Sequence, residues 1–307
     1  MGNLKHRALR GRVIAIALKG LSFITRHLPL RMIRAFGAAT GDLAYYALPR
    51  YRNRALANIA IAFPDWSERR RRSTIRKMFR DLGASTFELG WLDNLDRKML
   101  ERTTEIRGVE NIEEARAMGR GTLIFTAHCG NWEWLGATTA LLGYPLTVLQ
   151  RDRDEKDFNR MIAQMHERVG MRTIWRGSTA GALEMFRTLR SGGFLGFLID
   201  QNIRAESVKV PFFGQPALTP IGPAKLAVRA EAPVMTCFIE RRNGKQIVTF
   251  HKPIPTRRTD DPVEITARLT SAIEAHIRQV PEQWVWFHPR WKERKKWEVT
   301  AAANSSK

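Results

Sequence analysis

The segment Thr126–Glu133 carries the residue types that a proton-transfer site needs. His128 directly follows the apolar run 121–127, which is typical of a buried strand, and Glu133 falls in the first turn of the helix expected next. Gly130 permits a tight turn between them, so that the carboxylate can fold back onto the imidazole. Such a pair predicts a general base, His128, whose tautomer and charge are controlled by Glu133 while the substrate supplies the nucleophile.

Other chemistry at this segment has weaker support. No serine stands in a nucleophile-elbow setting. Cys129 is adjacent to His128, so the two side chains should diverge, which argues against a cysteine nucleophile. Two candidate ligands do not make a metal site, and no metal or cofactor is expected. The alternative interpretation is a structural histidine whose hydrogen bonds are satisfied.

Alternating strands and helices must position this segment from about residue 107 onward. Strands are expected over 121–127, 146–150, 172–175, 194–199, 234–240 and 246–251, and helices over 131–142, 158–169, 180–189, 221–229 and 262–278. Asn243-Gly244 predicts a hairpin turn between the last two strands. The alternation predicts an α/β fold with a mixed, mostly parallel central sheet flanked by helices. Functional residues gather at the carboxyl ends of strands in such folds, and His128 lies at such an end.

The first 30 residues carry a regular basic pattern. Lys5, Arg12, Lys19 and Arg26 recur every seven residues, an apolar face lies opposite them, and Pro29 ends the run. Residues 1–30 therefore favour an amphipathic helix that lies in an anionic membrane interface. A soluble helix packed on the protein and a tilted span are the alternatives, since no run of about 18 apolar residues is present.

One domain is expected over the rest of the chain. It would cover 31–299, helical over 31–105 and α/β over 106–299, with a disordered tail at 300–307. The helices at its start include 50–63 and 68–91, separated by a turn that contains Pro64.

The composition restricts the classes of partner. The chain of 307 residues carries 51 Lys and Arg against 30 Asp and Glu, a net charge of +21, and its first 80 residues hold 18 basic and three acidic side chains. Such a surface favours anionic lipid, an acidic protein or nucleic acid. Two cysteines exclude a disulfide scaffold and indicate a reducing compartment.

Several blocks resemble the glycerolipid and lysophospholipid acyltransferase superfamily, and within it the bacterial lipid A late acyltransferases. His128 and Glu133 match its His-x4-Glu signature. Four further blocks are similar to segments of that family, so that the resemblance runs from about residue 50 to 297: 55–64 (ALANIAIAFP), 200–202 (DQN) with 210–217 (VPFFGQPA), 219–227 (TPIGPAKLA) and 281–292 (PEQWVWFHPRWK).

The resemblance implies an inner-membrane enzyme with a cytoplasmic active site. Acyl carrier protein would be its donor, and an anionic lipid A precursor its acceptor. Arg151 would bind phosphate or the developing oxyanion, although Gln150 and Asp152 depart from the family pattern, and an ion pair with Asp152 or Asp154 is the alternative. Asp200 and Gln201 would position the acceptor or cap a loop.

Aromatic residues have two interpretations. Phe212 and Phe213, with Gly214, would line an acyl channel or pack in the core. Trp284, Trp286 and Trp291, with Arg290, would form an interfacial belt or pack in the core.

The expected reaction is direct acyl transfer. His128 would take a proton from an acceptor hydroxyl, Glu133 would stabilise the imidazolium, and the alkoxide would attack the donor thioester. The mannoside acyltransferases and other envelope-lipid acyltransferases share the blocks, and a hydrolase would differ only in accepting water. A basic nucleic-acid-binding protein is the rival from another class. No nucleic acid is expected, since no zinc-finger, helix-turn-helix or RNA-recognition motif is present.

Overall fold

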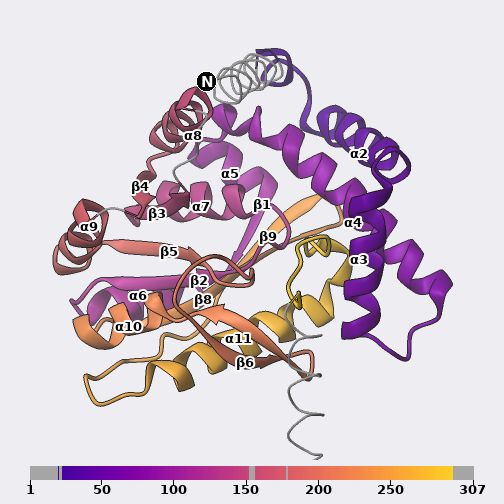
Figure 1. The fold of residues 1–307 in the computed structure, drawn as a ribbon. Helices are drawn as coiled ribbons and strands as arrows, with labels where there is room; N and C mark the ends of the chain where they lie inside the picture. Colours follow the sequence, from indigo (N-terminus) through magenta and orange to yellow (C-terminus); the bar gives the residue numbers. More distant parts are fainter. Residues whose placement is uncertain (1–19, 21–22, 152–155, 178, 293–307) are drawn as a thin grey trace, which may run out of the picture.

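The central sheet of the computed structural model is mixed and mostly parallel (Figure 1). The structure describes residues 20, 23–151, 156–177 and 179–292. Within them seven strands pair in the order β1 (Thr104–Arg107), β9 (Lys245–Phe250), β8 (Val234–Arg242), β2 (Thr122–Thr126), β5 (Phe194–Leu198), β3 (Leu146–Arg151) and β4 (Arg172–Arg176). The strands from β8 to β4 run parallel to one another, and β9 with its parallel neighbour β1 runs the opposite way.

The sheet forms because its central strands bury both faces. Every residue of β2 is buried, as a parallel strand covered on both sides requires. Leu123 and Phe125 point into one apolar cluster, and Ile124 between them points into the other. Each cluster is closed by helices, so the sheet has no solvated face along β2.

Helices lie on both faces of the sheet and beside one edge. On one face pack α5 (Arg97–Thr103), α6 (Val109–Ala117), α7 (Trp132–Leu141) and α8 (Lys156–Arg168). On the other pack α9 (Thr179–Arg190), α10 (Gly222–Ala230) and α11 (Pro262–Gln279). Three more helices stand together at one end of the molecule: α2 (Leu30–Ala47), α3 (Pro49–Ala62) and α4 (Glu68–Leu89) (Figure 1). Short 3-10 turns occur at η1 (Leu92–Asn94) and η2 (Pro281–Gln283).

Glycines bring α2 and α4 unusually close together. A Cβ atom on Gly37 of α2 would lie 2.6 Å from the carbonyl oxygen of Gly83 in α4, and a Cβ on Gly41 would collide with the backbone at Phe79. Only glycine permits this approach. The contact fixes which face of α2 turns inward and leaves the opposite face exposed.

A separate hairpin, β6 (Ser207–Phe212) and β7 (Gln215–Pro220), was not predicted. Prolines within the run argue against a strand, and here Pro211 and Pro216 face each other in the register. Phe213 and Gly214 form the turn with φ of 52° and 69°, the left-handed conformation that two-residue hairpins favour. Asn243 and Gly244 make the expected turn between β8 and β9 in the same way.

The predicted α/β class and mostly parallel sheet are confirmed. Each strand and helix expected from residue 121 onward is present, with ends shifted by one or two residues, whereas β1, α6 and the β6–β7 hairpin were missed. Every helix in the described part of the chain is too short or too polar to span a bilayer. Most of the basic stripe of 1–30 lies outside the described residues, as do the tail 300–307 and the proposed partners Asp152 and Asp154.

Candidate active site

Two neighbouring parallel strands end side by side at the candidate site. β2 and β5 pair in the register Thr126 with Leu198. His128 follows β2 by two residues and Asp200 follows β5 by two residues, so both reach the same edge of the sheet. Residues 72 positions apart in the chain therefore meet.

Asp200 binds the imidazole of His128. The Asp200 Oδ1 atom lies 2.8 Å from His128 Nδ1, while Oδ2 accepts hydrogen bonds from the His128 backbone N–H at 3.0 Å and from Trp284 Nε1 at 2.8 Å. The Asp200 side chain is only 1% exposed. Burial opposes its ionisation, but the charge and hydrogen bonds of His128 and the bond from Trp284 outweigh burial and lower the pKa of Asp200 to about 2.

An ionised Asp200 determines the tautomer of His128. A carboxylate only accepts hydrogen bonds, so Nδ1 carries the ring proton and donates it to Oδ1. The other nitrogen, Nε2, is then the basic atom of the neutral ring. The side chain of His128 is 25% exposed, and Trp132 packs edge-on against it with ring centroids 5.0 Å apart. The arrangement is a general base held in place by a buried carboxylate.

Glu133 does not make the predicted contact with His128. Its Oε2 atom lies 2.8 Å from Nε2 of His166 in α8, and Nδ1 of His166 lies 2.7 Å from the Thr173 hydroxyl. Glu133 belongs to the first turn of α7, whose orientation is fixed by Asn131, the N-cap residue that accepts the Trp134 backbone N–H at 3.1 Å. That turn directs Glu133 towards α8, and Asp200 takes the place at His128 Nδ1 that was expected for Glu133.

The loop that carries His128 is held from both sides by the segment 283–285. Gly130 N–H donates to the carbonyl of Gln283 at 2.9 Å, and Val285 N–H donates to the carbonyl of His128 at 3.0 Å. Gly130 has a φ of 61°, and a Cβ there would lie 2.6 Å from the carbonyl oxygen of Ile239. Glycine is therefore required at this position, both for its conformation and for its close contact with β8.

A buried ionic cluster lies behind the same loop. Glu88 of α4 accepts hydrogen bonds from Asn131 Nδ2 at 2.8 Å and from Arg241 at 2.7 Å, and also pairs with Arg34 of α2. Burial opposes ionisation of Glu88, but Arg241 and Arg34 outweigh it and lower the pKa of the carboxyl. The cluster ties α2, α4 and β8 to the start of α7, and so positions the loop indirectly.

Comparison with known proteins decides the family. The sequence model of the bacterial lipid A biosynthesis acyltransferases matches residues 2–293. The chain belongs to this family. It is 26% identical over 262 residues to a lipid A biosynthesis acyltransferase of Haemophilus influenzae, covering 84% of this chain and 81% of the relative. It is 27% identical to the lipid A biosynthesis lauroyltransferase of Escherichia coli, covering 90% of each. A phosphatidylinositol mannoside acyltransferase of Mycobacterium tuberculosis is 27% identical over 208 residues, covering 65% of this chain and 64% of the relative.

Family membership makes this protein an acyltransferase. The remaining predicted site residues can be placed relative to His128, its candidate general base. Arg151 ends β3, the neighbour of β5, and is exposed at the same edge as His128. Gln201 is half-buried next to Asp200, and Gly214 is exposed in the turn of the β6–β7 hairpin. The structure gives none of these three a contact that defines a role in acyl transfer.

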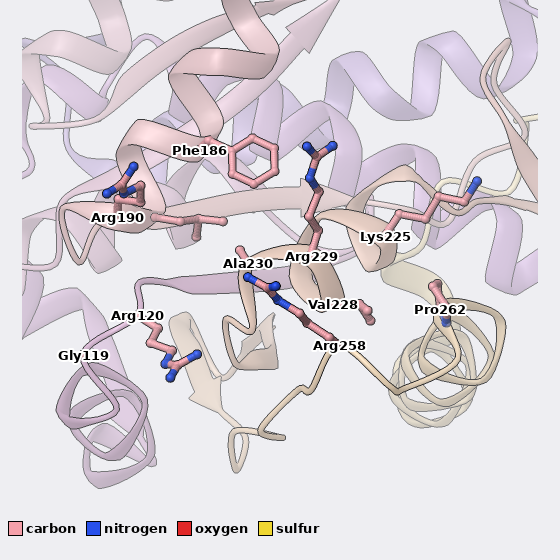
Figure 2. A pocket seen from close by; sticks show the side chains of 11 residues that line it. Gly119, Arg120, Phe186, Arg190, Lys225, Val228, Arg229, Ala230, Arg258 and Pro262 are labelled. Atoms are coloured by element: carbon pink, nitrogen blue, oxygen red, sulfur yellow. The ribbon is translucent and has the colours of Figure 1, made fainter.

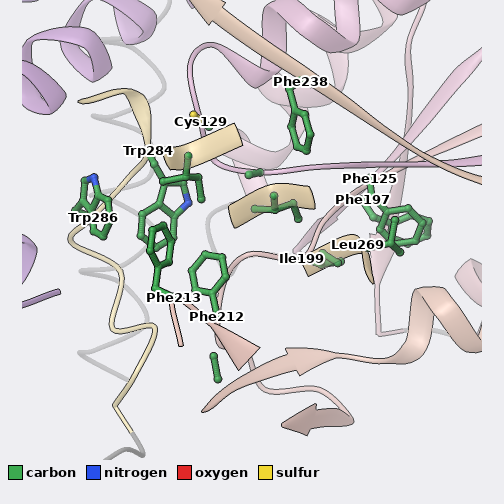
Figure 3. Close-up of a cluster of buried hydrophobic side chains, with 14 of the residues drawn as sticks. Phe125, Cys129, Phe197, Ile199, Phe212, Phe213, Phe238, Leu269, Trp284 and Trp286 are labelled. Atoms are coloured by element: carbon green, nitrogen blue, oxygen red, sulfur yellow. The ribbon is translucent and has the colours of Figure 1, made fainter. Parts of the chain in front are cut away.

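The aromatic residues of the predicted channel and belt belong to the core of the acyltransferase (Figure 3). Phe212 packs edge-on against Trp284 at 5.6 Å, and Trp284 packs against Trp286 at 4.6 Å. Phe213, Trp291 and the guanidinium of Arg290 complete the cluster, and all are buried. The core interpretation of the four residues Trp284, Trp286, Trp291 and Arg290 is therefore correct. The cluster supports Trp284, which in turn donates to Asp200.

Cys129 is buried beside the base, and burial raises the pKa of its thiol well above the ordinary value. A protonated, buried thiol is a poor nucleophile. In the part of the chain that the structure describes, no three His, Cys, Asp or Glu side chains are grouped as a metal site would need.

A basic surface depression lies away from this site. It has a volume of about 870 Å³ and is lined by basic side chains that include Arg120, Arg190 and Arg229 (Figure 2). Arg120 precedes β2 and Arg190 precedes β5, so the depression is at the amino ends of the strands whose carboxyl ends carry His128 and Asp200. It is not part of the candidate active site.

Proposed function

We propose that the protein transfers a fatty acyl chain from the thioester of acyl carrier protein to a hydroxyl of a lipid A precursor. The observation that carries the proposal is the hydrogen bond between His128 and the buried carboxylate of Asp200, because it leaves Nε2 as a partly exposed base at the edge where β2 and β5 end. A thioester is already activated, so the reaction needs a base for the hydroxyl and stabilisation of the oxyanion, with no acyl-enzyme.

The proposed reaction has two steps. First, Nε2 of His128 accepts the proton of the acceptor hydroxyl while the oxygen attacks the thioester carbonyl carbon, and the ionised Asp200 stabilises the imidazolium that forms. Second, the tetrahedral oxyanion collapses, the carbon–sulfur bond breaks, and Nε2 returns the proton to the leaving thiolate. Backbone N–H groups or Arg151 would stabilise the oxyanion. The enzyme ends the cycle as it began, with one ester formed and one thiol released.

Charge supports the proposed partners. Acyl carrier protein is acidic, the lipid A precursor carries phosphates, and the inner-membrane leaflet is anionic, so a protein with a net charge of +21 is attracted to all three. We place the enzyme at the cytoplasmic face of the cell inner membrane, with the basic residues of 1–30 contributing to attachment.

Another envelope lipid is the second candidate acceptor. The relatives named phosphatidylinositol mannoside acyltransferases match about two thirds of this chain, so the common scaffold does not by itself determine the acceptor. Hydrolysis is the remaining rival, because water could replace the acceptor hydroxyl at the same base.

Product analysis separates these activities. The full-length protein would be incubated with lauroyl-, myristoyl- or palmitoyl-acyl carrier protein as donor. The acceptor would be a lipid A precursor, a phosphatidylinositol mannoside or none, and the products would be identified by mass spectrometry. The proposal predicts one added acyl group on the lipid A precursor. Acylation of the mannoside alone would make the second candidate correct, and free fatty acid at the same rate without acceptor would make the protein a thioesterase.

A further inference from the structure

The segment 23–51, which contains α2 and the start of α3, exposes an unusual number of apolar side chains. Among the described residues, ten large hydrophobic side chains are exposed, and eight of them lie between residues 23 and 51: Phe23, Ile24, Met32, Phe36, Leu43, Tyr46, Leu48 and Tyr51. The other two, Leu183 in α9 and Val263 in α11, stand apart in the fold. Single exposed apolar residues need no explanation, but a contiguous group marks an interaction surface.

The exposed side chains of α2 follow its helical period. Met32, Phe36, Leu43 and Tyr46 are spaced by four, seven and three residues, so they lie along one stripe of the helix. The opposite stripe, which includes Gly37 and Gly41, is the one that packs on α4. Because that close contact fixes the rotation of α2, the outer stripe has no way to turn inward. α2 is therefore apolar on two sides, and only one of them is covered by the described residues.

Basic side chains surround this face. Arg26, Arg31 and Arg50 are exposed near its ends. Asp42 is the one acidic residue between 23 and 64, and it is neutralised by ion pairs with Arg76 and Arg80 of α4. The guanidinium of Arg26 lies 4.5 Å from the centroid of Phe23, and that of Arg76 lies 5.8 Å from the centroid of Tyr46. Apolar and aromatic side chains ringed by arginine match the layered chemistry of an anionic lipid surface, and a net positive rim disfavours a second copy of the same face.

The same face is connected to the active site through a few contacts. The ring of Tyr51 packs edge-on against Phe287 with centroids 5.5 Å apart. Asn58 of α3 donates to the carbonyl oxygens of Trp286 at 2.7 Å and His288 at 2.6 Å. The segment that α3 holds in this way continues to Trp284, which donates to Asp200. The exposed face therefore contacts this short segment at Phe287, and Asp200, which holds His128, contacts it at Trp284.

We propose that the outer stripe of α2, with Leu48 and Tyr51 at the start of α3, is the surface that rests on an anionic bilayer and sets the position of His128 relative to it. A lipid acceptor would then reach Nε2 from the membrane without leaving it. This second statement rests on the proposed function, whereas the lipid contact stands on the exposed face alone. The surface shares only Arg26 with the basic stripe of 1–30, and adds to whatever binding the other residues of that stripe provide.

The test uses full-length protein and vesicles of phosphatidylcholine with or without phosphatidylglycerol. The double variant Phe36→Ser with Leu43→Ser removes two apolar side chains from the centre of the stripe. Leu183→Ser is the matched control, since Leu183 is 51% exposed and Phe36 is 54% exposed. We expect the double variant to bind phosphatidylglycerol vesicles about tenfold or more weakly, and the control to bind within about twofold of wild type. Wild type should bind vesicles of phosphatidylcholine alone less strongly, because the arginine rim requires anionic headgroups.

Two further readouts make the result decisive. Thermal melting should be unchanged in both variants, because the substituted side chains are exposed. Acyl transfer to acceptor dispersed in detergent micelles should also be unchanged, while transfer to acceptor embedded in vesicles should fall with binding. Unchanged vesicle binding by the double variant would overturn the proposal, and if the wild type were a dimer that the double variant dissociates, the face would belong to self-association. A wild type inactive in micelles yet bound to vesicles would refute the proposed function and leave the lipid surface intact.

Discussion

His128 Nδ1 and Asp200 Oδ1 lie 2.8 Å apart, although the two residues are 72 positions apart in the sequence. The pair exists because β2 and β5 are hydrogen-bonded neighbours that end at the same level. The carboxylate is buried, ionised and held by three hydrogen-bonding contacts, so the geometry of the base is determined before any substrate arrives.

Replacement of Asp200 should be more damaging than replacement of Glu133. In Asp200→Asn the amide can present its N–H to Nδ1, which favours the wrong tautomer and cannot stabilise the imidazolium. We expect kcat to fall by roughly 10²–10⁴-fold, and Glu133→Gln to cost less, because its amide oxygen can still accept from His166. Steady-state kinetics of both purified variants check the order. Near-normal turnover in Asp200→Asn together with a dead Glu133→Gln would restore the pairing predicted from the sequence.

Glu133 and His166 should act as one unit. Their atoms lie 2.8 Å apart, and the bond fixes the first turn of α7 to α8. Glu133→Ala, His166→Ala and the double variant form a double-mutant cycle, and removal of either partner should cause most of the effect of removing both. The coupling should show in the unfolding free energy, at about 1 kcal/mol or more, as well as in kcat. Additive effects on stability would show that the contact contributes nothing to the fold.

Cys129→Ala should retain most of the activity. The thiol is buried and its pKa is raised, so it is protonated and inaccessible, and the proposed transfer forms no acyl-enzyme. A modest loss of stability is expected from the small cavity. Intact-protein mass spectrometry of the wild type with donor alone provides the check: a covalent acyl adduct that Cys129→Ala lacks would replace direct transfer by a two-step mechanism.

Stability should fall below neutral pH through His276. Burial against Phe238, whose ring stacks on it at 4.5 Å, lowers the pKa of His276 from 6.5 to about 4. The unfolded chain therefore binds a proton between pH 6.5 and 4 that the folded protein does not, so this contribution to stability is present above pH 6.5 and is lost as the pH falls through that window.

His276→Phe keeps the stacking and removes the titration. Between pH 7.5 and 4.5 the unfolding free energy of the wild type should drop by about 2–3 kcal/mol more than that of the variant. Urea denaturation across this range measures the difference, and His288, whose pKa burial also lowers to about 4, contributes equally to both proteins. Parallel curves for the two proteins would show that His276 is protonated as easily in the folded state as in the unfolded one.

The sequence predicted local elements well but predicted the wrong carboxylate as the partner of His128. Apolar runs such as 121–127 and turn residues such as Asn243-Gly244 are local signals, and the strands and the hairpin they predict are present. The order of strands is not a local property. Asp200 is predictable as a strand-end residue that positions the acceptor or caps a loop, but nothing in the sequence shows that β5 lies beside β2. Glu133 was preferred for its nearness in sequence, whereas the N-cap of α7 directs it to α8.

In the proposed transfer, Nε2 of His128 takes the proton of the acceptor hydroxyl. The most direct test measures the single-turnover rate of acyl transfer from acyl carrier protein thioester to the lipid A precursor, with the product detected by mass spectrometry. Wild type and His128→Ala are compared after both have been shown to be equally folded. We expect His128→Ala to bind both substrates but to transfer the acyl group at least about 10²-fold more slowly. Transfer by His128→Ala at the wild-type rate would show that His128 is not the base.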